Sequence, residues 1–93
     1  MIKAMTKELI ETKYRYADVE LISGAVVTAN EVTIVEGKIS SIVSAVIKVD
    51  KKTLAFSVFG TGENRLYNMQ NVPEGVDGKA EIKEFMNLVE SNL

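Results

Sequence analysis

The strongest constraint on the fold of this chain is a run of residues in which apolar and polar side chains alternate on both sides of a short polar loop. The run extends from Ser44 to Val58 and reads S-A-V-I-K-V-D-K-K-T-L-A-F-S-V. Alternation with a period of two predicts half-buried strands, because successive side chains of a strand point to opposite faces of a sheet. Since the polar loop separates two such strands, the run predicts an antiparallel hairpin.

Shorter runs of the same kind lie on both sides of this hairpin and are joined by sequences typical of turns. Gly37 can adopt a positive φ at little cost, which favours a turn at that position. Ala29 and Asn30 interrupt the alternation, so they are expected to separate two strands. The first strand of the hairpin is long and is expected to bend or bulge near Ser40 and Ser41. The predicted strands cover residues 17–21, 25–28, 31–35, 39–50, 54–58 and 66–72.

Two segments have apolar residues at helical spacing instead. Residues 2–13 place the apolar side chains of Ile2, Met5, Leu9 and Ile10 together, which predicts a short amphipathic helix. After Asp77, a suitable N-cap, apolar residues recur at i, i+3, i+4, i+7 and i+11, which predicts an amphipathic C-terminal helix. The apolar stripe of this second helix comprises Ile82, Phe85, Met86, Val89 and Leu93.

These elements predict an α+β fold in a single globular domain, residues 1–93. The expected architecture is a five- or six-stranded, strongly bent antiparallel sheet or small barrel, with a short N-terminal helix and an amphipathic C-terminal helix. Such a sheet must hide one face, either by curling around a helix or by staying open with both helices on one side. Apolar residues on both predicted faces, among them Val35 and Val46, favour curling or a subunit interface.

The composition removes most of the usual catalytic chemistry. The chain has no cysteine and no histidine, which excludes thiolate nucleophiles, disulfides and the commonest general base. Two carboxylate pairs, Asp18 with Glu20 and Glu81 with Glu84, have a spacing that could hold a hard cation. Both pairs are predicted on the solvent side, where acidic residues need no special explanation. We therefore expect no enzymatic activity, no cofactor and no bound metal.

The segment G-T-G-E-N-R at residues 60–65 could form either a phosphate-binding loop or a tight turn between strands. A phosphate-binding loop needs the N-terminus of a helix directly after it, because the free N–H groups there hold the anion. The residues that follow have the pattern of a strand and end at Pro73. Neither a third glycine at the dinucleotide spacing nor a Gly-Lys-Ser/Thr ending is present. The segment is therefore predicted to be a hairpin loop.

The sequence contains no signal for export or membrane insertion. The first residues carry charge too early to form the apolar part of a signal peptide. No apolar run approaches the ~20 residues that a membrane-spanning helix needs. A cytoplasmic protein without membrane contact is expected.

Two functions fit these features. The first is a non-enzymatic protein-interaction or assembly module that forms a homo-oligomer or joins a larger complex. Exposed sheet edges support it, as do charge blocks of alternating sign: residues 16–36 carry four acids and no base, whereas residues 37–65 carry five bases and two acids. The second is a small barrel that binds single-stranded nucleic acid through aromatic and cationic side chains, which the net charge of −2 disfavours. The candidate binding residues are Tyr14, Arg15, Tyr16, Lys51, Lys52, Arg65 and Tyr67.

Overall fold

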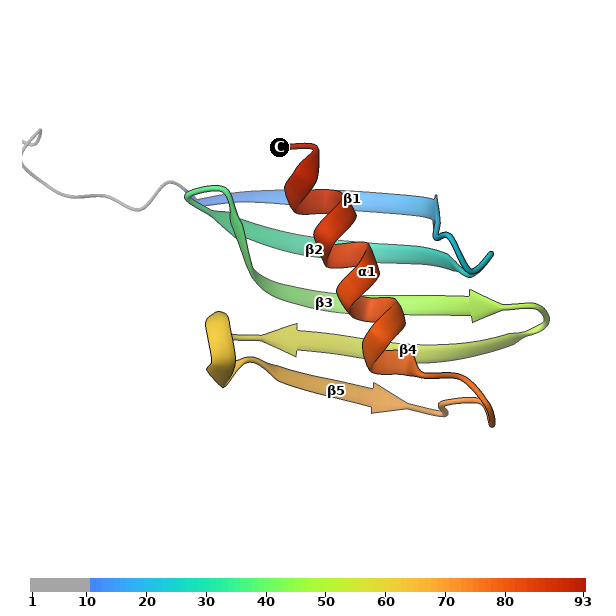
Figure 1. The fold of residues 1–93 in the computed structure, drawn as a ribbon. Coiled ribbons are helices and arrows are strands. Elements are labelled where there is room, and N and C mark those ends of the chain that lie inside the picture. The colour runs from blue at the N-terminus through green and yellow to red at the C-terminus, as the bar shows by residue number, and fades with distance from the viewer. Residues whose placement is uncertain (1–10) are drawn as a thin grey trace, which may run out of the picture.

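A computed structural model describes residues 11–93 and consists of one antiparallel sheet with one helix on it (Figure 1). Its elements are β1 (Glu11–Glu20), β2 (Val26–Val35), β3 (Lys38–Val49), β4 (Lys52–Phe59), the short 3-10 helix η2 (Gly62–Asn64), β5 (Leu66–Gln70) and α1 (Gly78–Ser91). The five strands are ordered β1-β2-β3-β4-β5, so each strand pairs only with its neighbours in the sequence. Because β1 and β5 form the two edges, the sheet is open, and the small-barrel alternative is wrong.

The N-terminal part of the described chain is a strand and not the end of a helix. The predicted helix at residues 2–13 lies mostly outside the described residues, but Glu11–Lys13 belong to β1, so the prediction is wrong there. The physical reason is that side chains already alternate between the two faces of the sheet before Ala17, where the alternation of apolar residues begins. Tyr14 and Tyr16 point to the helix side and Lys13 to the other, and this edge strand pairs with β2 through Tyr14 and Val32.

Irregularities in the strand register fall where the alternation of apolar residues shifts. The bulge expected near Ser40 is confirmed, because β2 residues Thr33 and Ile34 pair with residues two apart in β3. The expected break at Ala29 and Asn30 is wrong, since β2 runs through both residues. The register shift between Tyr14 and Tyr16 of β1 instead places an extra residue in β2 at this point. The apolar set therefore moves by one position and stays on the same face of the sheet.

The helix α1 covers one face of the sheet and completes the core. Figure 1 shows α1 crossing the strands from β4 at its N-terminal end to β1 at its C-terminal end. The N-cap prediction is confirmed, because Oδ1 of Asp77 accepts from the backbone N–H of Ala80 at 3.1 Å. The predicted stripe is buried except for Leu93, which lies beyond the end of the helix and is 52% exposed. No helix within residues 11–93 is long and apolar enough to cross a membrane.

Three carboxylates of α1 fasten the helix to the ends of the strands. Oε2 of Glu84 accepts from the backbone N–H of Ile22 at 2.6 Å, and Oε1 of Glu81 accepts from the hydroxyl of Ser23 at 2.9 Å. At the other end of the sheet, Oε2 of Glu90 accepts from the backbone N–H of Ile39 at 2.8 Å. Glu81 and Glu84, considered above as ligands for a hard cation, thus hold the turn between β1 and β2.

We expect Glu90→Ala to lower the free energy of unfolding by about 1–3 kcal/mol, because the partly buried N–H of Ile39 would lose its acceptor. Glu90→Gln keeps an acceptor oxygen and should cost clearly less. Urea unfolding of both variants, with the exposed Glu74→Ala as the control, measures the difference. A Glu90→Ala variant as stable as Glu74→Ala would show that this hydrogen bond contributes nothing.

Candidate functional site

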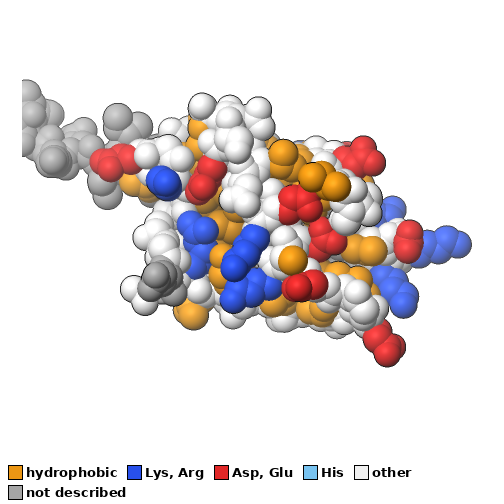
Figure 2. Space-filling model, viewed as in Figure 1, with side chains coloured by type: hydrophobic (Ala, Val, Ile, Leu, Met, Phe, Trp, Pro, Cys, Tyr) orange, Lys and Arg blue, Asp and Glu red, His pale blue; other side chains and the backbone are white. Residues whose placement is uncertain are grey.

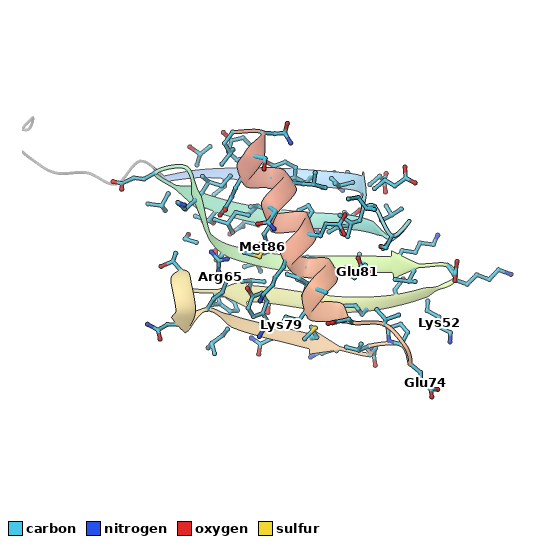
Figure 3. The ribbon with its side chains drawn as sticks, viewed as in Figure 1. Lys52, Arg65, Glu74, Lys79, Glu81 and Met86 are labelled. Atoms are coloured by element: carbon cyan, nitrogen blue, oxygen red, sulfur yellow. The ribbon has the colours of Figure 1, made fainter. Side chains whose placement is uncertain are left out.

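The residues predicted to bind a partner do not form one surface. Tyr14, Arg15 and Tyr16 lie on β1, whereas Arg65 and Tyr67 lie on or beside β5, at the opposite edge of the sheet. Lys51 and Lys52 lie at the turn between β3 and β4, at the far end of β4 from Arg65. Figure 3 shows this separation for Lys52 and Arg65. The sequence placed these residues together only because the order and the ends of the strands were not known.

The two tyrosines of β1 belong to the helix side of the sheet, where they extend the core. Their rings stack at a centroid distance of 5.9 Å, and Tyr16 meets Phe85 edge to face, also at 5.9 Å. Burial raises the pKa of the Tyr16 hydroxyl above its ordinary value, and the neighbouring Tyr14 adds to this rise. Arg15 points away from them, and its Nε donates to Oδ1 of Asn30 at 3.1 Å. The three residues therefore do not act as a unit.

A groove between β5 and α1 gathers cations around one aromatic ring. We call it the basic groove and define it by Arg65, Tyr67, Lys79 and Lys83. The ammonium groups of Lys79 and Lys83 lie 5.1 and 6.0 Å from the centre of the Tyr67 ring. Arg65, Tyr67 and Lys83 line a hollow of about 170 Å³, whose other walls are Met86, Asn87 and Glu90.

The basic groove is visible as a patch of positive charge on the β5 side of the helix in Figure 2, and Figure 3 shows Arg65 and Lys79 on this same side. Sequence analysis found Arg65 and Tyr67 but missed both lysines. Their spacing of four residues on a helix was a usable signal, because it places them on one face. What the sequence did not reveal is that this face looks toward β5.

The side of the sheet away from α1 is a second candidate surface, which we call the open face. Its residues alternate along the strands with the buried ones, and no element within residues 11–93 packs on it. Two rows across the paired strands form its centre. One row consists of Leu66, Phe59, Ser41 and Thr33, and the other of Gln70, Ala55, Val46 and Thr28.

The open face carries exposed apolar side chains on β3, β4 and β5, and its charged side chains lie mainly on β1, β2 and the ends of β3. Val46, Phe59 and Leu66 are 41%, 44% and 64% exposed, which is a large solvent contact for such side chains. From β2 to β5 neither of these two rows contains a charged residue, but Lys13 of β1 pairs with Thr33 at the end of the first row, and Glu31, which pairs with Val43, lies between the two rows on β2. The charged side chains on this side come from β1, from Glu31 and from the ends of β3; Lys13 of β1 pairs with Glu31 at 3.3 Å. A charge-poor centre inside a polar rim is the pattern of a protein interface.

The carboxylates and the loop at residues 60–65 are the two features that the sequence offered for metal or phosphate binding. In the part of the chain that the structure describes, no three Asp or Glu residues converge as metal ligands would. The loop at residues 60–65 joins β4 to β5, which confirms the hairpin-loop prediction. Gly60 has φ +95°, and an added Cβ would lie 3.3 Å from the backbone oxygen of Asn64.

Comparison with protein-family models, with curated proteins and with solved structures found no match to this chain.

Proposed function

We propose that this protein is a non-enzymatic interaction module that self-associates, and that the open face of its sheet is the docking surface. The observation that carries this proposal is a sheet face that no described element covers and that is partly apolar and uncharged along the middle of β3, β4 and β5. A sheet of this kind gains stability when both faces are covered, because water contact with side chains such as Phe59 and Leu66 is then removed.

A second copy of the chain is the partner that this surface fits best. Five strands spaced ~4.8 Å apart, with about nine residues each at ~3.3 Å, cover roughly 700 Å² in projection. This is of the same order as the ~800 Å² of accessible surface that each partner buries in a standard stable interface. Two copies can approach face to face through the uncharged middle of β3, β4 and β5, and twofold pairing of identical surfaces is the commonest form of assembly.

Binding of single-stranded nucleic acid is less well supported. It requires stacking rings and cations along one continuous path. The candidate tyrosines of β1 and the cations near β5 lie at opposite edges of the sheet, with the helix between them on that side (Figure 1). The overall charge of −2 also opposes the approach of a polyanion.

Val46→Lys tests the proposal, because Val46 lies on the central strand of the open face. In a twofold dimer the new charges of the two copies would lie near each other without a partner. We expect the wild type to be dimeric at ~10 µM and the variant to dissociate with a Kd raised at least ~100-fold, or about 2.7 kcal/mol. Sedimentation equilibrium or light scattering over a concentration series measures both.

Leu88→Lys is the matched control, since Leu88 is a similarly exposed apolar residue on α1, on the other side of the sheet. It should leave the dimer intact. A wild type that stays monomeric at several hundred micromolar, or a Leu88→Lys variant that dissociates as readily as Val46→Lys, would contradict the proposal.

A further inference from the structure

The basic groove has a feature that the open face does not account for, namely an arginine already held in place. Nε of Arg65 donates to the carbonyl oxygen of Gly60 at 3.1 Å, and Nη2 donates to the carbonyl oxygen of Ile39 at 2.9 Å. Because these bonds fix the guanidinium plane, little side-chain entropy remains to be lost when the group binds a ligand. A guanidinium carries five N–H groups, so donors remain after these two bonds.

The two lysines of the basic groove add charge at a cost to the free protein. Like charges at i and i+4 of a helix repel each other. Among the side chains that the structure describes, the one ion pair is that of Lys13 with Glu31, so no described carboxylate lies within 4.0 Å of the ammonium group of Lys79 or Lys83. The ring of Tyr67 offsets part of the repulsion through its contact with both ammonium groups.

We propose that the basic groove binds one compact oxyanion, a phosphate group. Arg65 and Lys83 line the hollow, and the ammonium group of Lys79 lies over the ring of Tyr67 beside it, so the groove carries three positive charges. Glu90, which lines the hollow while accepting from Ile39, brings one negative charge. The balance of +2 matches the −1.5 to −2 charge that a phosphate monoester carries at about neutral pH. Charge-assisted hydrogen bonds from a fixed guanidinium to phosphate oxygens would hold the group.

The size and surroundings of the groove favour a compact anion over an extended one. A hollow of about 170 Å³ is smaller than the ~300 Å³ at which pockets for larger ligands begin. The opposite flank of α1 carries Glu81 and Glu84, which would repel the continuing backbone of a polyanion (Figure 3). The ligand is therefore a free phosphate ion or a single phosphorylated side chain of a protein.

The double variant Lys79→Gln/Lys83→Gln tests this site in the full chain. Sodium phosphate is titrated at constant ionic strength, and the backbone amide signals are followed by NMR. For the wild type we expect saturable shifts at Arg65, Tyr67 and the first two turns of α1, with a Kd near ~1 mM. The double variant should bind at least ~10-fold more weakly.

Lys51→Gln/Lys52→Gln is the matched control, because it removes the same charge from the exposed turn between β3 and β4. It should bind phosphate as the wild type does. Equal weakening by both double variants, unchanged binding by Lys79→Gln/Lys83→Gln, or shifts that never saturate would overturn the site.

Two further titrations identify the source of the phosphate group. A phosphoserine peptide that binds the same residues more tightly than inorganic phosphate would indicate a phosphorylated partner protein, whereas equal affinity would indicate the free ion. Tighter binding of a ten-residue oligothymidylate at these residues would overturn the preference for a compact anion. None of these outcomes depends on whether the open face forms a dimer.

Discussion

Phe85→Ala should lower the free energy of unfolding by about 3–5 kcal/mol, one of the largest effects expected of any single truncation in this protein. Phe85 is completely buried and is among the largest such side chains within residues 11–93. Its removal would leave a cavity between α1 and the sheet, and it would also remove the edge-to-face contact with Tyr16. Since small domains are stable by only about 5–15 kcal/mol, a large part of the stability would be lost.

Urea unfolding at two protein concentrations measures this effect and separates it from any change in association. Phe85→Leu retains most of the buried volume and should be less destabilising than the alanine variant. Leu88→Ala, on the exposed flank of the same helix, should change stability by less than ~1 kcal/mol. If Phe85→Ala and Leu88→Ala had similar effects, the packing of α1 on the sheet described above would be wrong.

Val58→Lys should prevent folding, whereas Phe59→Lys at the next position should leave a folded chain. Val58 is fully buried on the face of the sheet that α1 covers. A lysine there would place an unpaired charge in the core at a cost of several kcal/mol. Phe59 points to the open face and is 44% exposed, so its replacement should cost the monomer about 1 kcal/mol or less.

Circular dichroism and size-exclusion chromatography distinguish the two variants. We expect Val58→Lys to lack cooperative unfolding and Phe59→Lys to unfold cooperatively while dimerising more weakly than the wild type. Two variants that are equally folded or equally unfolded would mean that the faces have been assigned wrongly, because adjacent residues of a strand lie on opposite sides.

The sequence predicted correctly those helices and strands that bury one face in the core and expose the other to solvent. The hairpin of β3 and β4 alternates from Ala45 to Val58 apart from the apolar Val46, and α1 has both a capping aspartate and a continuous apolar stripe. In these elements the buried positions recur every two residues in a strand and every three or four in a helix, so the spacing of apolar residues identifies the element. The bulge at Ser40 followed from the same argument, since a strand this long needs to bend.

The parts that it did not predict lie at edges and irregularities. At the start of β1 the helix-side positions are Thr12, Tyr14 and Tyr16, whose hydroxyl groups weaken the contrast between the two faces, so this part of the strand resembled the end of a helix. Beside Asn30 the extra residue in β2 shifts the apolar residues by one position, which in the sequence looks like the end of a strand. Whether a sheet closes depends on contacts between its first and last strands, and these leave no local pattern in the sequence.

The basic groove was only half visible in the sequence for a related reason. Arg65 and Tyr67 stand close together in the chain, but the lysines that join them come from a helix that begins eight residues after β5 ends. The placement of these lysines depends on the direction in which α1 crosses the sheet. That direction is fixed by the connection after β5 and by carboxylates such as Glu84 and Glu90, which bind backbone groups at opposite ends of the sheet.

The order of elements along the chain also has a consequence for biosynthesis. Every strand pairs with the strand made just before it, so hairpins can form one after another as the polypeptide leaves the ribosome. The helix that shields the apolar side of these hairpins is made after all of them. We therefore expect a nascent chain that ends before Gly78 to expose the apolar side of its hairpins, and to be prone to aggregation, until translation of α1 is complete.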